Sequence, residues 1–307
     1  MILLCGIRSE RPLAMVAAEL EGIGRQYRLF NQRRVSECHI SWQVETTGAV
    51  TGLLNLAGEV LPLEGITAAY VRLMDDRVLP ELEDQPAGSP ARRHARGFHD
   101  ALYRWLEIAP GHIVNRAEPQ GSNGSKPYQA QLIAGFGFLV PETLITNDPE
   151  AVLAFEREHG PLVYKSISAV RSIVQRFGEE DRARLDLIRW CPVQFQALIP
   201  GVDVRVHVVG REVFATEIVS DVLDYRYARK SGGKAELRRF ELPPNVAERC
   251  VAAAAGLELP FVGIDLKVTP TGEVYCFEVN PCPAFSYFEA NTGQPIAHAV
   301  ARYLVEE

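Results

Sequence analysis

The sequence predicts a mixed α/β chain that opens with an α/β unit and continues in lobes of α+β type. In residues 1–85, strand-length apolar runs such as Ile2–Ile7 and Ala68–Leu73 alternate with helical patterns. This alternation is typical of an open unit with a parallel sheet. From Val193 onward, strand patterns dominate until a closing helix expected over Gln294–Val305.

The elements between these ends follow in chain order. A first helix is expected near Leu13–Ile23, and a second begins where Ser89 and Pro90 occupy the favoured cap and first-turn positions. Its apolar stripe, which should face the core, consists of Phe98, Leu102, Trp105 and Leu106. Further along, the pattern predicts two helices and two strands: helix 127–136, strand 143–146, helix 149–159 and strand 162–166.

The second helix carries Arg92, Arg93 and Arg96 close to its start. The helix macrodipole disfavours cations at this end. A solvated face is the favoured interpretation, and partners elsewhere in the fold that hold these arginines are the alternative.

A chain of 307 residues exceeds one typical core, so we expect two or three subdomains. We divide it into a first α/β domain (1–112), a middle lobe (113–190) and a C-terminal lobe (191–307) that carries the hairpin described below.

Composition narrows the classes of function. A net charge of -7 argues against a nucleic-acid partner, because phosphate binding calls for a basic surface. No apolar run reaches the roughly 20 residues of a membrane span, and the start lacks the pattern of a signal peptide, so we expect a cytoplasmic protein without a membrane partner. The six cysteines show no metal spacing and are expected to be reduced thiols. The oligomeric state is left open, a homo-oligomer included.

The most informative segment is 263–280, GIDLKVTPTGEVYCFEVN, in which two alternating runs flank a turn with Thr271 and Gly272. This pattern predicts a β-hairpin. With these two residues as the loop, Asp265 lies opposite Glu278, and Asn280 shares their face because side chains alternate along a strand. Ile264, Leu266, Phe277 and Val279 should then face the core.

Two opposed carboxylates on a sheet repel each other unless a cation or a proton separates them. Oxygen donors from Asp, Glu and Asn, without His or Cys, suit a hard ion, and Mg²⁺ completed by nucleotide phosphates is the natural candidate. An exposed hairpin with scattered acids is the alternative.

The hairpin resembles the signature of the ATP-grasp ligases, and within them of the RimK-like group. The likeness covers residues 113–307, and the upstream part is compatible with a pre-ATP-grasp domain. It implies an ATP-grasp fold, ATP as the nucleotide, and two Mg²⁺ ions held by Asp265, Glu278 and Asn280.

Two lysines and one arginine follow from the same resemblance. The segment NGSKPYQAQLIAGFGFLVPETLITND makes Lys126 the first phosphate-contacting lysine, at a helix start where an anion is favoured. The strand PLVYKSIS resembles the second lysine strand and implies Lys165 at the α- and β-phosphates. The usual glycine-rich flap is replaced by SISAVRSIVQRF, in which Arg171 could bind phosphate.

The segment VQFQALIPGVDVRVHVVG resembles the adenine hinge and ribose site. The resemblance implies main-chain contacts to adenine at Ala197 and Ile199, a ribose contact at Asp203, and Gln196 in the same nucleotide site. Many members have a glutamate at the position of Ala197.

Charge that develops on an acyl phosphate calls for cations around the reacting centre. Arg205 and Arg226 resemble arginines that RimK-like ligases and the related maturases of microviridin-type (graspetide) peptides use there. Arg205 should share a strand face with Asp203 and with His207, which we expect to be satisfied within the sheet.

The resulting hypothesis is an ATP-dependent ligase that activates a carboxylate as an acyl phosphate and passes it to an amine or hydroxyl. Its substrate would be a peptide or protein, modified either by amino-acid addition, as in RimK-like enzymes, or by crosslinking, as in peptide maturases. The main alternative is a small-molecule carboxylate, as for D-alanine:D-alanine ligase or glutathione synthetase. An ATP-binding regulator without turnover and an ATP-grasp kinase are the two remaining alternatives.

Overall fold

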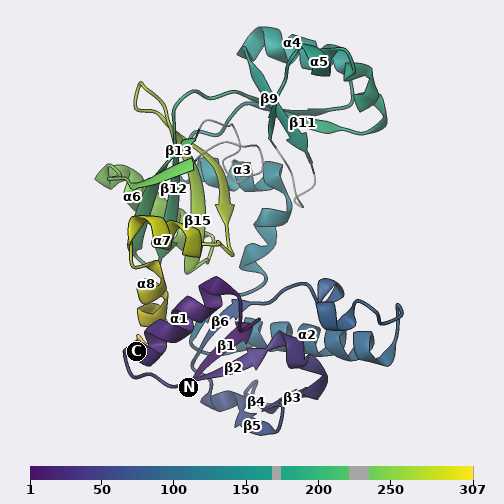
Figure 1. Ribbon diagram of the computed structural model, residues 1–307, viewed down its shortest axis with the longest axis vertical. Coiled ribbons are helices and arrows are strands. Elements are labelled where there is room, and N and C mark those ends of the chain that lie inside the picture. Colours follow the sequence, from purple (N-terminus) through teal and green to yellow (C-terminus); the bar gives the residue numbers. More distant parts are fainter. Residues whose placement is uncertain (168–173, 221–234, 307) are drawn as a thin grey trace.

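The computed structural model describes residues 1–167, 174–220 and 235–306, and within them the strands form four sheets (Figure 1). None of the helices in these ranges is both long and apolar enough to cross a membrane.

The N-terminal sheet is parallel throughout, in the order β2-β1-β6-β7, as the sequence predicted. Alternate residues of β1 serve two cores: Ile2 and Leu4 pack with the first helix, whereas Leu3 and Cys5 pack with the second. The elements of this unit are β1 (Ile2–Gly6), α1 (Arg11–Gly22), β2 (Tyr27–Asn31), β6 (Ala68–Arg72), α2 (Pro90–Ile108) and β7 (His112–Val114).

Helix α2 begins as predicted, since the Ser89 side chain accepts a hydrogen bond from the Arg92 N–H. Its expected stripe is buried, with Phe98 at 4% exposure and Leu102 at 0%. An antiparallel meander that the sequence analysis did not identify covers the same core: β3 (Cys38–Val44), β4 (Val50–Leu56) and β5 (Glu59–Pro62).

A small sheet in the order β10-β9-β11-β8 packs one face on α4 and its neighbours. Four of its elements were predicted: β8 (Thr143–Thr146), α4 (Pro149–His159), β9 (Leu162–Ser166) and β11 (Val193–Ala197). Two were not: β10 (Gln175–Arg176) and α5 (Glu179–Arg182). The division of the chain at residues 112 and 190 stays a prediction. Because β11 pairs with β8 and β9, lobes that follow the sheets would divide after Ala197.

The large sheet runs in the order β14-β13-β12-β15-β16. Its strands are β12 (Val202–Val209), β13 (Glu212–Ser220), β14 (Ala235–Arg239), β15 (Phe261–Val268) and β16 (Val274–Asn280). Strands dominate after Val193 as predicted, but the sequence analysis did not identify α6 (Pro244–Gly256), which interrupts them. Proline in its first turn and its run of alanines are strong helix signals.

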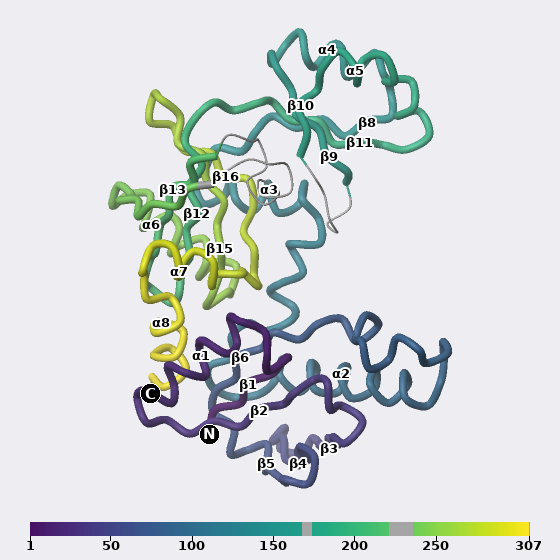
Figure 2. Tube along the Cα trace, viewed as in Figure 1, coloured from purple at the N-terminus to yellow at the C-terminus, as the bar shows by residue number. Residues whose placement is uncertain are grey.

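Two pairs of helices cover the two faces of the large sheet, each pair in its own core. Helix α6 and α3 (Lys126–Gly135) share a core with one face, and the closing helices α7 (Ser286–Thr292) and α8 (Ile296–Tyr303) share one with the other. Helix α8 returns to α1, so the two ends of the chain lie close together (Figure 2). This return packs the N-terminal unit against the large sheet.

Candidate active site

The hairpin of β15 and β16 places Asp265 opposite Glu278, as predicted. The predicted two-residue loop was wrong. Thr269 pairs with Glu273 through a hydrogen bond of 2.9 Å, which leaves three residues, 270–272, in the loop. A β-bulge then absorbs one residue of β16 between Leu266 and Asp265, and this restores the predicted acid pair.

The bulge also changes which side chains of β16 face the core. Cys276 is 1% exposed and belongs to the core, whereas Phe277, expected there, is only partly buried and is absent from it. Ile264, Leu266 and Val279 are buried as predicted. The acids therefore keep their predicted face although the alternation is broken beside them.

Each acid of the pair contacts a cation from a different element. The Lys126 ammonium group donates to Glu278 Oε1, and it lies 3.3 Å from Asn123 Oδ1. Arg205 Nη1 donates to Asp265 Oδ1 at 2.6 Å, from the neighbouring strand β12. Two carboxylates and two cations thus meet on one face of the large sheet.

Arg205 is held in place by the absence of a side chain at Gly263. A Cβ at Gly263 would lie 2.0 Å from Arg205 Nη2, so the guanidinium group crosses the strand over this residue. Gly263 is also the cross-strand partner of Asn280. Since Arg205 is only 5% exposed, its side chain has little room to move elsewhere.

The donors of the hairpin fit a hard cation that keeps other oxygen ligands. No group of three His, Cys, Asp or Glu side chains suited to a metal is found in the described ranges. The set Asp265, Glu278 and Asn280 supplies two carboxylates and one amide oxygen, which the Cys282 N–H orients at 2.9 Å. Such a set suits Mg²⁺ that is bound largely through nucleotide phosphates.

Two buried amides that the sequence analysis missed fix the hairpin. Asn115, just after β7, donates to the carbonyl oxygens of Phe261 and Pro281, both at 2.6 Å. Gln129 of α3 donates to the Val279 carbonyl oxygen at 2.8 Å and accepts from the Val279 N–H at 3.1 Å. Because Gln129 follows Lys126 by one helical turn, this pairing fixes α3, and with it Lys126, against β16.

Replacing Gln129 by methionine should therefore lower the free energy of unfolding by about 1–3 kcal/mol, because the buried N–H and C=O of Val279 lose their partners. Urea unfolding would measure this change, and ATP affinity should fall with it because Lys126 is less well fixed. Gln26→Met, at an exposed position, is the matched control. Equal stability of both variants would remove Gln129 from the support of the site.

The nucleotide residues predicted from the hinge lie where β11 of the small sheet ends and β12 of the large sheet begins. Gln196 donates to Thr143 Oγ1 at 2.9 Å, and the Ala197 N–H donates to the Glu142 carbonyl oxygen at 3.0 Å. The N–H of Ile199 makes no hydrogen bond to any residue of the described ranges. Lys165 pairs along β9 with Gln194 of β11, so these two side chains share a face.

Asp203, the predicted ribose contact, lies 3.0 Å from Lys267 Nζ on the adjacent strand. Burial raises the pKa of the Asp203 carboxyl, and the Lys267 charge opposes this rise. Arg171 and Arg226 fall in segments 168–173 and 221–234, outside the described residues.

His207 shares the face of Arg205 but is not satisfied as expected. Neither ring nitrogen has a hydrogen-bond partner in the described part of the chain, and the ring lies 5.0 Å from that of Phe288. Burial lowers the pKa of His207 well below its usual value, and the nearby Arg205 charge adds to this. The imidazole is therefore neutral and lies in an apolar environment.

Comparison with known proteins decides the family. The model of the RimK-like ATP-grasp domain matches residues 126–304, more than half of the chain. The chain belongs to the RimK-like ATP-grasp family. It is an ATP-grasp ligase, an enzyme that forms C–N or ester bonds, and the predicted ATP-grasp fold is confirmed.

Individual relatives agree with this family. The ligase is 25% identical over 218 residues to the probable alpha-L-glutamate ligase 2 of Hahella chejuensis. This alignment covers 67% of this chain and 71% of that protein. The ATP-grasp ligase PsnB, complexed with minimal precursor, Mg and ADP, has a TM-score of 0.78 at 27% identity, covering 99% of this chain and 96% of its own. A RiPP-associated ATP-grasp ligase of Chryseobacterium gregarium, in complex with ADP and a leader and core peptide, has a TM-score of 0.81 at 22% identity, with coverage of 99% and 96%.

Proposed function

We propose that this ATP-grasp ligase uses ATP and Mg²⁺ to activate a carboxylate of a peptide as an acyl phosphate, which then reacts with an amine or hydroxyl. The observation that carries the proposal is the meeting of Asp265 and Glu278 with Arg205 and Lys126 on one face of the large sheet. Such a face can bind a triphosphate with its metal ions beside a reacting carboxylate.

The residues divide between the nucleotide and the metal. Asp265, Glu278 and Asn280 would hold two Mg²⁺ ions, whose charge offsets that of the phosphates. Lys126, Lys165 and Arg171 would bind the phosphates. The base and ribose would contact the remaining predicted residues: Gln196, Ala197, Ile199 and Asp203.

Arg205 and Arg226 would act at the reacting centre. The substrate carboxylate attacks the γ-phosphorus and ADP leaves, and the acceptor then attacks the acyl carbon and expels phosphate. Both steps gather negative charge on oxygens, which fixed guanidinium groups stabilise. Burial and the Arg205 charge lower the pKa of His207, so its ring is a poor proton acceptor, and the acceptor would arrive already neutral or lose its proton to solvent.

A peptide substrate is supported by the solved structures of similar chains. The structure of PsnB, at 27% identity and with 96% of its length covered, is complexed with minimal precursor, and the similarity includes the N-terminal unit as well as the ATP-grasp lobes. The alternative, amino-acid addition to a protein or small metabolite, is supported by the probable glutamate ligase from Hahella.

The test is a reaction with Mg²⁺, ATP and the short acidic peptide, if any, encoded next to this gene, analysed by mass spectrometry. Crosslinking should lower the peptide mass by one water for each bond, whereas amino-acid addition would raise it by one residue. ADP release that depends on free amino acids and not on the peptide would contradict a peptide substrate.

Magnesium should decide how strongly ATP stabilises the fold. ATP with Mg²⁺ should raise the melting temperature clearly more than ATP with chelator, because the opposed Asp265 and Glu278 repel a triphosphate that brings no cation. A thermal-shift series at fixed ATP would measure this difference. Equal shifts with and without the metal would remove the hairpin from the nucleotide site.

A further inference from the structure

A second charged site lies in the N-terminal unit, in a cavity of about 540 Å³ between α2, the segment after β6 and the segment that leads to α3. We call it the α2 cavity. Its volume lies in the usual range for ligand sites, about 300–1,000 Å³. Helix α2 contributes a stripe at helical spacing beside its buried one: Arg96, His99, Asp100, Tyr103 and Arg104.

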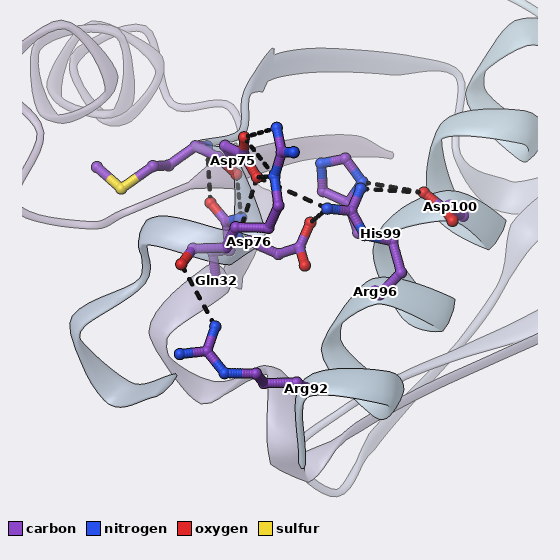
Figure 3. Close-up of polar contacts among 9 residues, drawn as sticks. Gln32, Asp75, Asp76, Arg92, Arg96, His99 and Asp100 are labelled. Carbon is purple, nitrogen blue, oxygen red and sulfur yellow. Dashed lines mark hydrogen bonds and ion pairs between the residues drawn. The ribbon is translucent and has the colours of Figure 1, made fainter. Parts of the chain in front are cut away.

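The acids around the α2 cavity already have cationic partners. Arg77 binds Asp75 through Nε at 2.9 Å, and Arg96 Nη2 lies 2.8 Å from Asp76 Oδ1. Figure 3 shows Arg96 between Asp76 and Asp100, and its Nη1 lies 3.7 Å from Asp100 Oδ1. These contacts explain the arginines near the start of α2, because carboxylates and loop carbonyl oxygens hold them against the macrodipole.

After this pairing, the cavity keeps one cation and one hydroxyl without partners. Arg104 makes no ion pair or hydrogen bond within the described residues, and neither does the Tyr103 hydroxyl. The His99 ring lies beside that of Tyr103, tilted by 58° with centroids 4.6 Å apart, and its Nδ1 lies 3.5 Å from Asp100 Oδ1 without a hydrogen bond in the same ranges. These groups are mainly donors, and a guanidinium fork matches a carboxylate.

The α2 cavity adjoins the reaction face of the large sheet. Gln120, on its wall, donates to the main-chain oxygen of Asn115, the residue that fixes both ends of the hairpin. The wall of the cavity and the two ends of the hairpin are therefore joined by consecutive hydrogen bonds through Asn115.

We propose that the α2 cavity binds an acidic side chain of the peptide substrate, with Arg104 and the Tyr103 hydroxyl as its donors. The proposal rests on the proposed function, since it needs a peptide beside the ATP site. It assigns the N-terminal unit a role in selecting acidic sequences. The net charge of -7 gives the whole protein an electrostatic field that repels an acidic peptide at long range. Any affinity for such a peptide must therefore come from a local cationic site.

The test uses a short oligo-L-glutamate peptide as the probe, with oligo-L-glutamine of equal length as the neutral comparison, titrated calorimetrically into the full chain. The wild-type protein should bind the acidic peptide and not the neutral one. Arg104→Gln should weaken binding by about tenfold to a hundredfold, the usual effect of a lost hydrogen bond to a charged group. Tyr103→Phe keeps the ring and should weaken it less.

Arg25→Gln is the matched control, because Arg25 is exposed and lies outside the cavity. This variant should bind oligo-L-glutamate as the wild type does. Unchanged binding in Arg104→Gln, or equal losses in both variants, would overturn the proposal. If the wild type binds ATP with Mg²⁺ but not the acidic peptide, the cavity assignment fails while the proposed nucleotide chemistry stands.

Discussion

Replacing Glu278 by glutamine should lower the rate of ADP release by about two to three powers of ten while the protein stays folded. Glutamine keeps the shape of the side chain but removes the charge that Lys126 contacts and that we propose binds Mg²⁺. Glu278 is only partly buried, so the fold does not depend on its carboxylate for core packing. Lys165→Ala should have a similar effect, because it removes the cation that we propose binds the α- and β-phosphates.

A coupled assay of ADP release would measure both variants, and circular dichroism would confirm that each is folded. Glu273→Gln is the matched control, since this exposed glutamate lies in the same hairpin beside the loop and away from the acid pair. It should retain full turnover. Turnover near wild type in Glu278→Gln or Lys165→Ala would mean that the motif assignment is wrong.

Arg205→Lys should lower kcat and kcat/KM together by about two to three powers of ten, while the affinity for ATP stays nearly unchanged. A lysine supplies a point charge in place of the planar fork that would bind both Asp265 and the reacting oxygens in the proposed mechanism. Gly263→Ala should reproduce the effect without removing any charge, because its Cβ would occupy the place of the Arg205 guanidinium group.

Steady-state kinetics with saturating ATP would separate these effects. Gly97→Ala is the matched control, since a Cβ there meets no atom within 4 Å, and it should leave turnover intact. If Arg205→Lys weakens ATP binding and spares turnover at saturation, Arg205 belongs to the nucleotide site, and Arg226 remains the candidate at the reacting centre. Wild-type turnover in Gly263→Ala would show that the position of the Arg205 side chain is not essential.

The acid pair of the hairpin shows how much of the site can be predicted from the alternation of residues within a strand. The alternation of β15 and β16 predicted that Asp265 opposes Glu278, and the structure agrees. Two errors cancelled, however, because a three-residue loop and a bulge each shift the register by one residue. The position of a bulge depends on how the strand packs against its neighbours, and no turn residue in this sequence indicates it. The side chain at Phe277 was misplaced for this reason.

The sequence by itself determined the family motifs, the parallel N-terminal sheet, the helix that begins after Ser89, and the face on which the hairpin acids lie. These features depend on spacing within single segments, which periodicity and capping residues report directly. Only the tertiary structure decided what meets those acids. Lys126 reaches Glu278 across 152 residues of chain, and Gln129 reaches Val279 across 150. Such contacts arise from the packing of α3 on β16, because segments distant in sequence share no period.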